Sequence, residues 1–307
     1  MKATAFAPAT VANVGPGFDI LGFAVAGRGD EVTVATRQEA GISVQMHGPG
    51  SEVISTDPAQ NTATAGLLQL LADHSLHHGL QVNITKGIPI GSGLGGSAAS
   101  AVGGIVAANA ALGLGLSNHD MLRYALIGES VASGDAHPDN AAPCLWGGFT
   151  FAKVLSHGIE VRALPLLPEL HVVLVHPSVR VDTRMARQVL PDAFERGLVV
   201  QQTANLTRMV CAAYEGDWEG FADACEDVLV QPYRSSLIPH FDAVRNAALG
   251  NGALSFSISG SGPTMFALAT AEHAEGVRAA CAGVFDGLVD VQSFVSPLGA
   301  PGARIIA

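Results

Sequence analysis

The stretch Pro89-Ile-Gly-Ser-Gly-Leu-Gly-Gly-Ser-Ala-Ala99 decides how the rest of this chain is interpreted. Four glycines run directly into an alanine-rich segment, which is expected to be helical from Ser97 to about Leu112 and buried on nearly every side. Glycine adopts positive φ without strain, and the unpaired N–H groups at the start of a helix attract anions. The stretch therefore predicts a phosphate-binding loop followed by a central helix.

Three interpretations of this glycine loop are open. A dinucleotide-binding fingerprint matches as Gly91, Gly93 and Gly96, but it requires a strand directly before the glycines and an acidic residue about 20 residues later. The apolar alternation already ends at Lys86, and residues 110–118 contain no acid. A P-loop would end in Gly-Lys-Ser or Gly-Lys-Thr, whereas this loop ends in Gly-Gly-Ser. A triphosphate loop without a Walker lysine and a purely structural turn fit these residues better than a dinucleotide fingerprint does.

The composition indicates a globular protein. The chain has 307 residues, 48% of them hydrophobic, which suffice for one or two domains with a large core. A net charge of −11 and the lack of any lysine or arginine run argue against nucleic-acid and anionic-membrane partners. Four widely separated cysteines predict reduced thiols. Without a signal-peptide pattern or an apolar run long enough for a membrane span, we expect a cytoplasmic location.

The hydrophobic pattern predicts an α+β protein with a domain boundary near residue 160, giving domains 1–160 and 161–307. In the first domain we expect strands at Glu31–Arg37, Gly41–Met46, Leu80–Thr85 and Phe149–Val154, and helices from Asn61 to Gly79, from Ser97 to Leu112 and from Ser117 to Ala132. In the second we expect strands at Leu170–His176, Ala253–Ser259, Thr264–Ala269 and Leu288–Phe294, and helices at Thr183–Leu190, Val199–Tyr214, Trp218–Val230, Phe241–Leu249 and Glu272–Gly283.

Glu129 is the most informative single residue outside the loop. Leu122, Ala125 and Leu126 precede it at helical spacing, which places its carboxylate at or on the apolar face of that helix. It is either a surface glutamate at the edge of the stripe or a buried acid that needs a cation. Mg²⁺ prefers one or two protein oxygens together with phosphate oxygens, and the hydroxyl of Ser97 suits that role as well as a plain N-cap.

The sequence contains two polar clusters, one near the N-terminus and one directly after the Glu129 helix. Residues Ala9–Asp19 are expected to form a loop in which Asn13 and Asp19 surround a Gly-Pro-Gly turn, where such side chains usually serve local turn bonds. The segment Gly134–Asn140 follows the Glu129 helix directly, so it can share a site with that carboxylate.

The second domain contributes arginines and a glycine turn. Thr183 and Arg187 stand one helical turn apart, and Arg234 lies in a break between helices. Surface exposure is the ordinary role for each arginine, but a chain with only 16 lysines and arginines has few for binding an anionic substrate. The turn within Ser257–Thr264 is either a simple hairpin or a backbone that closes over a ligand.

Taken together, three motifs in this order resemble the GHMP kinases. They are the N-terminal segment Ala9–Gly22, the glycine loop Pro89–Ala99 and the segment Ile258–Ala267, and they span nearly the whole chain. The resemblance implies a two-domain fold, with a ribosomal-S5-like N-terminal domain that binds ATP and a ferredoxin-like C-terminal domain. The substrates would meet between the two domains.

Within this family the chain is most similar to the homoserine-phosphorylating branch, through the segments His137–Asn140, Thr183–Arg187 and Pro232–Arg234. For the nucleotide, the resemblance places Asn61 and Lys86 near the adenosine and assigns Mg²⁺ to Ser97 and Glu129. The triphosphate would lie on the loop residues Pro89, Ile90, Gly91, Ser92, Gly93, Leu94, Gly95, Gly96, Ser97 and Ala98. One departure is Gly96, where the family usually has a serine, and it removes a hydroxyl near the phosphates.

The resemblance also implies a partner for each polar group of L-homoserine. Asp19 would bind the ammonium, Arg187 and Arg234 the carboxylate, and Asn140 the attacking hydroxyl. Catalysis would then rest on Asn140, Glu129 and Ser97, with in-line transfer and no strong base, because phosphoryl transfer chiefly needs alignment and charge neutralisation. The supporting substrate contacts would be Asn13, Asp139 and Thr183.

The leading expectation is therefore an ATP-dependent homoserine phosphotransferase that acts in threonine biosynthesis, with ATP and L-homoserine as its partners and a homodimer left open. Three alternatives remain: a kinase of the same family for another small alcohol, a non-catalytic nucleotide-binding regulator on the same fold, and a dinucleotide-dependent oxidoreductase. Substrate choice and nucleotide turnover separate them.

Overall fold

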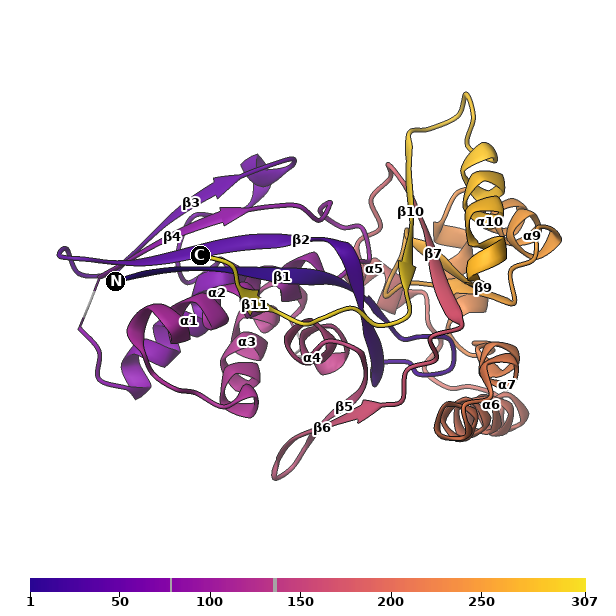
Figure 1. Ribbon diagram of the computed structural model, residues 1–307, viewed down its shortest axis with the longest axis horizontal. Helices are drawn as coiled ribbons and strands as arrows, with labels where there is room; N and C mark the ends of the chain where they lie inside the picture. Colours follow the sequence, from indigo (N-terminus) through magenta and orange to yellow (C-terminus); the bar gives the residue numbers. More distant parts are fainter. Residues whose placement is uncertain (78, 135–136) are drawn as a thin grey trace.

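The structure is a computed structural model that describes residues 1–77, 79–134 and 137–307. Two β-sheets, each covered by helices, lie side by side, and the two ends of the chain lie close together on the larger sheet (Figure 1). The predicted α+β composition is confirmed. No helix in the described part of the chain has the length and apolar character needed to cross a bilayer.

The first sheet carries helices on one of its faces, below the strands in Figure 1. Most neighbouring strands of this sheet are antiparallel, but β3 and β4 are parallel because helix α1 forms the crossover between them. Its strands, in spatial order, are β11 (Arg304–Ile305), β1 (Lys2–Ala12), β2 (Leu21–Arg37), β4 (Gly79–Thr85) and β3 (Ile42–His47), with β5 (Phe149–Leu155) and β6 (Gly158–Leu164) joined to β2. The elements beside them are the 3₁₀ turn at Ser51–Val53, α1 (Thr62–Asp73), α2 (Gly96–Leu112), α3 (Asn118–Ser133) and α4 (Pro138–Trp146).

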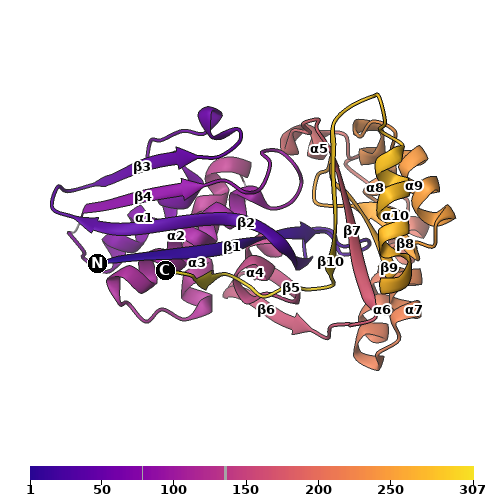
Figure 2. The same ribbon diagram turned by 45° about the horizontal axis from the view of Figure 1, so that its top comes forward.

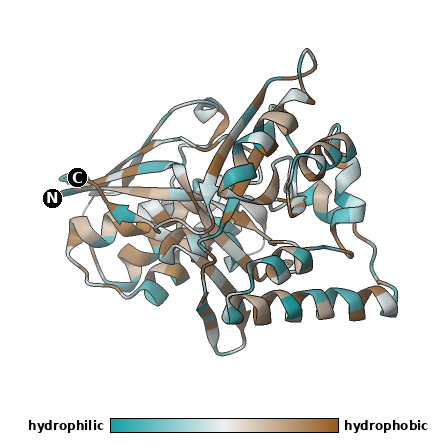
Figure 3. Cartoon of the chain, turned by 45° about the vertical axis from the view of Figure 1, so that its right-hand side comes forward, coloured by the Kyte–Doolittle hydropathy of each residue, from teal (hydrophilic) through white to brown (hydrophobic). Residues whose placement is uncertain are grey.

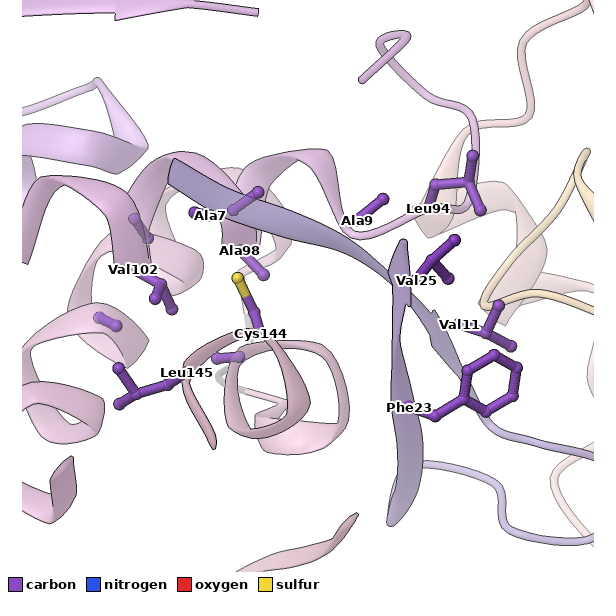
Figure 4. Packing of buried hydrophobic residues seen from close by; sticks show 14 of the residues in the cluster. Ala7, Ala9, Val11, Phe23, Val25, Leu94, Ala98, Val102, Cys144 and Leu145 are labelled. Atoms are coloured by element: carbon purple, nitrogen blue, oxygen red, sulfur yellow. The ribbon is translucent and has the colours of Figure 1, made fainter. Parts of the chain in front are cut away.

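Helix α2 lies at the centre of this layer, as predicted. A Cβ on Gly103 would lie 2.8 Å from Val32 of β2, and one on Gly104 would lie 2.3 Å from the carbonyl oxygen of Ala63 in α1. Small residues therefore let the helix approach strand and helix at once. Figure 4 shows its residues Ala98 and Val102 among buried side chains of the strands and of α4.

The second sheet is antiparallel and has two apolar faces. Val172 and Leu174 of β7 join the large cluster that also fills the first half of the chain, whereas Val173 and Val175 join a separate cluster. This alternation follows from the period of two in a strand. Its strands, in spatial order, are β10 (Val291–Pro297), β7 (Leu170–Pro177), β9 (Met265–Thr270) and β8 (Ser255–Ile258), as seen in Figure 2.

The helices of the second half cover both faces of that sheet. Residues of α9 and α10 belong to the separate cluster, and residues of α6 and α7 belong to the large one. Hydrophilic and hydrophobic residues alternate along the long helix at the lower right of Figure 3, which is expected for a helix with one exposed face. The bounds are α5 (Thr183–Gln188), α6 (Arg196–Glu215), α7 (Trp218–Ala224), α8 (Gln231–Arg234), a 3₁₀ turn (Ser235–Leu237), α9 (Phe241–Gly250) and α10 (Ala271–Gly283).

Several predicted bounds need correction. The expected loop Ala9–Asp19 begins as strand, since β1 extends to Ala12. The helix expected to reach Val230 ends at Ala224, because the carboxylate of Asp227 accepts hydrogen bonds from the N–H groups of three following residues and turns the chain. Helix α4 and strand β6 were not predicted.

Strand β6 runs across the proposed boundary at residue 160 and pairs with β5 of the first sheet. The chain also returns to that sheet at its end, where Ile305 pairs with Ala5. The division into 1–160 and 161–307 therefore stays a prediction, and the first sheet includes strand residues from beyond it.

Candidate active site

A cavity of about 600 Å³ lies between the two halves of the chain. Its lining combines the glycine loop with the N-terminal loop, α5 and the turn between β8 and β9. It contains the predicted residues Asn13, Asp19, Asn61, Lys86, Ile90, Gly91, Ser92, Gly93, Gly95, Gly96, Ser97, Glu129, Asp139, Asn140, Thr183, Arg187 and Arg234. Pro89, Leu94 and Ala98 are not among the lining residues.

The glycine loop presents its backbone amides to this cavity. Gly91, Gly93 and Gly95 have φ values of 66°, 77° and 65°, a region that costs other residues strain. Within residues 1–77, 79–134 and 137–307, the N–H groups of these three glycines and of Gly96 find no hydrogen-bond acceptor. The loop is held instead by Leu94, whose side chain joins the hydrophobic cluster in Figure 4.

Ser97 is not the N-cap of α2. That position belongs to Gly95, which is left-handed and makes no side-chain cap, so the first N–H groups of the helix are open to a ligand. A Cβ on Gly95 would lie 2.1 Å from Oγ1 of Thr10 and 2.7 Å from Oδ1 of Asn140. The loop and the predicted substrate side chain are therefore in direct proximity.

The glycine turn between β8 and β9 packs against the glycine loop. The hydroxyl of Ser259 donates to the carbonyl of Gly93 at 2.6 Å, and the N–H of Thr264 donates to the carbonyl of Ser92 at 3.1 Å. The Gly260 N–H donates to Ala12, at the end of β1, at 3.1 Å. This turn is more than a hairpin, because it connects the second sheet to both loops of the site.

Asn61 and Lys86 line the cavity with their polar groups already engaged. Asn61 caps α1, accepting from Ala63, and it donates to Ser55 at 2.8 Å. The ammonium of Lys86 is buried and forms an ion pair with Asp30. It also donates to the carbonyl of Gly96 and the hydroxyl of Ser100, at 2.7 and 2.8 Å. Lys86 therefore fixes the first turn of α2 through these two hydrogen bonds.

Glu129 is buried at the cavity and hydrogen-bonds to Ser97. Burial raises the pKa of its carboxyl to about 7, while the bond to Ser97 and the charge of Lys86 lower it. No group of three or more histidines, cysteines, aspartates or glutamates forms a metal cluster in the described parts of the chain. One carboxylate with one hydroxyl is, however, the sparse donor set that suits Mg²⁺ when phosphates complete its shell.

Asp19 and Arg187, predicted to bind opposite ends of an amino acid, pair with each other. The guanidinium donates to both carboxylate oxygens, at 2.9 and 3.2 Å. Arg187 also lies 2.8 Å from Nε2 of His137. Asn13 supports the pair, since its Oδ1 accepts from the Asp19 N–H and its amide donates to Gly260. The cavity wall thus presents adjacent negative and positive charges.

Arg234 is buried beside this pair. Its Nε donates to the carbonyl of Ala186 at 2.9 Å, and Nη1 donates to that of Gly260 at 3.0 Å. Burial, and next the charge of Arg187, lower its pKa to about 10, so it remains a cation at neutral pH. Phe18 lies against both guanidinium groups, with its ring centroid 5.6 Å from Arg187 and 5.1 Å from Arg234.

The segment with Asp139 and Asn140 begins helix α4. Oδ1 of Asn140 accepts from the Thr10 hydroxyl at 2.8 Å, which fixes the orientation of its amide. Asp139 is buried, and its Oδ1 has no partner among the described residues. Burial, followed by the charges of Asp19 and Glu129, raises the pKa of Asp139 to about 7. Residues 135 and 136 of the predicted polar cluster lie outside the described residues.

Sequence reasoning missed Thr10, Asp30, Arg180 and Arg184. Thr10 is fully buried. The sequence clue to it is a hydroxyl residue between two apolar neighbours, Ala9 and Val11, in β1. Arg180 and Arg184 line the cavity, and the scarcity of basic residues that singled out Arg187 applies to them equally. Nothing in the sequence around Asp30, within the alternating strand β2, indicates that it pairs with Lys86.

Comparisons with known proteins identify the family. The model for the GHMP kinases N terminal domain matches residues 61–148, and the GHMP kinases C terminal model matches residues 209–287. The chain is 40% identical over 309 residues to a homoserine kinase of Xylella fastidiosa (strain 9a5c), with 99% of this chain and 94% of that protein covered. It is 35% identical over 319 residues to a homoserine kinase of Chloroherpeton thalassium, with 99% of each covered.

Solved structures agree with the sequences. The crystal structure of homoserine kinase from Cytophaga hutchinsonii superposes with a TM-score of 0.94 at 39% identity, with 99% of this chain and 97% of that one covered. The mevalonate kinase of L. major shares the fold at a TM-score of 0.72 and 15% identity, with 95% of each chain covered. The chain therefore belongs to the GHMP kinase family, whose members use ATP as phosphate donor.

Proposed function

We propose that this chain transfers the γ-phosphoryl group of ATP to the side-chain hydroxyl of L-homoserine, giving O-phospho-L-homoserine and ADP. The observation that carries the proposal is the position of the Asp19–Arg187 pair in the same cavity as the open amides of the glycine loop. The full-length similarity to proteins named homoserine kinase supports the same substrate.

The loop suits a triphosphate. Four N–H groups without acceptors among the described residues, together with the start of α2, offer donors and a favourable dipole for an oxyanion. The fixed positive-φ glycines keep these donors in place before the nucleotide arrives. The family resemblance assigns Asn61 and Lys86 to the adenosine. Because protein partners already engage their polar groups, these two residues would shape the pocket.

Glu129 and Ser97 would hold Mg²⁺. Their fit rests on a carboxyl that is buried in the cavity wall with a hydroxyl beside it, an arrangement that favours a hard cation over an empty site. When bound, the ion would neutralise negative charge on the phosphate oxygens. The glutamate side chain is then ionised, which its burial otherwise opposes.

The charged wall suits a zwitterion. An α-amino acid carries an ammonium and a carboxylate on the same carbon atom, and the paired Asp19 and Arg187 present the opposite charges side by side. Arg234 adds a second guanidinium that is buried, desolvated and oriented by two carbonyls. Thr183, at the start of α5, adds a hydroxyl on the same wall.

Asn140 would align the attacking hydroxyl. Its Oδ1 is engaged by Thr10, and its Nδ2 has no acceptor in the described parts of the chain, so it can donate to the substrate oxygen. As that oxygen bonds to the γ-phosphorus, the bond to the bridging oxygen breaks with its electron pair leaving on ADP. The hydroxyl proton passes to a phosphate oxygen or water, so alignment suffices without a strong base.

The test is substrate choice in a coupled ADP-release assay with MgATP, followed by ³¹P NMR of the product. Turnover with L-homoserine, and none with mevalonate or galactose, supports the proposal. Turnover only with one of the other alcohols reassigns the substrate within the family. Nucleotide binding without turnover of any alcohol would instead identify a regulator on this fold.

A further inference from the structure

Arg180 brings a positive charge from the second half of the chain to the glycine loop. It lies between the end of β7 and the start of α5. A Cβ on Gly91 would lie 2.8 Å from Cγ of Arg180 and 3.2 Å from its Nε. The arginine stem therefore covers the first glycine of the loop, and the side chain lines the same cavity.

Three other cations that line this cavity already have partners. Lys86 pairs with Asp30, Arg187 pairs with Asp19, and Arg234 donates to two backbone carbonyls. A Walker lysine is absent from the loop. A nucleotide with four negative charges on its phosphates therefore meets few uncommitted positive groups in its binding site.

Arg180 is such a group. Its guanidinium makes no hydrogen bond, ion pair or ring contact with residues 1–77, 79–134 or 137–307, although its stem lies against Gly91. Arg184 also lines the cavity without a side-chain partner in those ranges, but it is not among the nearest atoms to a Cβ built on any glycine of the loop. Position and available charge together single out Arg180.

We propose that Arg180 contacts the terminal phosphates of bound ATP and supplies in cis the charge that this loop lacks. The inference rests on the proposed nucleotide site. During transfer, negative charge lies on the γ-phosphoryl oxygens while the bond to ADP breaks and the bond to the substrate oxygen forms. A guanidinium beside those oxygens stabilises this charge without giving up a proton.

The experiment compares Arg180→Met, which keeps an apolar stem without charge, with Arg180→Lys, which keeps the charge. Calorimetric titration uses the magnesium complexes of ADP and of the non-hydrolysable analogue AMP-PNP, and steady-state kinetics give kcat and both KM values. Arg245→Met, at an exposed position of α9 outside the cavity, is the matched control, and Arg184→Met tests the neighbouring arginine.

We expect Arg180→Met to weaken AMP-PNP binding by about tenfold or more and ADP binding by less than about twofold, as for a charged contact to the terminal phosphates. The kcat should fall by about tenfold or more, with the KM for homoserine unchanged, as for the loss of a guanidinium that neutralises the transferred group. Arg180→Lys should recover part of both losses, and Arg245→Met should match the wild type.

Equal weakening of both nucleotides, an effect confined to the KM for homoserine, or loss only in Arg184→Met would each overturn the assignment. A wild-type protein that binds AMP-PNP but phosphorylates a different alcohol would refute the proposed substrate and leave the Arg180 result intact. A wild-type protein that binds neither nucleotide would refute both.

Discussion

Arg187 on α5 binds both carboxylate oxygens of Asp19 in the N-terminal loop, at 2.9 and 3.2 Å, across the boundary between the two halves of the chain. The pair therefore does two things at once. It fixes the position of α5 over the cavity, and it keeps two opposite charges available where a zwitterionic substrate is expected. Their side chains are 34% and 21% exposed, so solvent can reach both groups.

Replacing Arg187 by methionine should raise the KM for homoserine by roughly 5- to 30-fold. Loss of one member of a desolvated charged contact costs about 2–5 kcal/mol, and partial exposure of this pair reduces that to about 1–2 kcal/mol. The KM for ATP should stay within about twofold. Arg208→Met, which removes an exposed pair with Asp223, is the control. An equal rise in both KM values would show that the change distorts the whole site.

Replacing Gly95 by alanine should abolish most of the nucleotide binding. The new Cβ would lie 2.1 Å from the Thr10 hydroxyl, far inside van der Waals contact, and φ is 65°. Gly113→Ala is the matched control, because Gly113 has a φ of 66° and open space around it. Backbone strain should cost each variant about 1–2 kcal/mol of folding stability, and the clash with Thr10 should add to that cost in Gly95→Ala alone. Only Gly95→Ala should lose binding in a titration with MgATP, and equal binding by both variants would contradict the loop assignment.

The local patterns of the sequence predicted much of this architecture. Helix α2 was recognised because its glycines and alanines admit close neighbours, and the structure places Gly103 and Gly104 against a strand and a helix. Helical spacing placed Glu129 at or on the apolar face and left a surface and a buried position open, and the structure shows it buried at the cavity. In both cases the local sequence of one element carried the signal.

Long-range relations could not be predicted in the same way. The return of the C-terminus to β1 depends on pairing between Ala5 and Ile305, and no local pattern encodes that contact. Helix α4 was hidden by Pro143 in its interior, which is normally unfavourable. The role proposed for Arg180 depends on its position beside Gly91, which only the folded chain brings about.

Replacing Glu129 by glutamine should raise the Mg²⁺ concentration needed for half-maximal activity by roughly 10- to 100-fold, because the amide keeps the shape of the carboxyl but loses its charge. Initial rates measured against Mg²⁺ at saturating ATP and homoserine provide the test. Glu219→Gln, at an exposed position of α7, should behave like the wild type. A Glu129→Gln enzyme with an unchanged Mg²⁺ response would remove this residue from the metal site.

Replacing Asp139 by asparagine should stabilise the ligand-free protein at pH 8. Burial and the neighbouring charges of Asp19 and Glu129 raise the folded pKa of Asp139 to about 7, above the 3.8 of the unfolded chain. Between these values the folded state retains a proton that the unfolded state releases, so the wild type loses stability as pH rises from about 4 to about 7 and then levels off. Urea unfolding at several pH values should show a gain of up to about 4 kcal/mol for Asp139→Asn at pH 8, and this gain should shrink toward pH 4. Asp223→Asn, which changes an exposed carboxylate, should show no comparable gain, and a difference between Asp139→Asn and wild type that does not vary with pH would mean that the carboxyl is not protonated in the folded state.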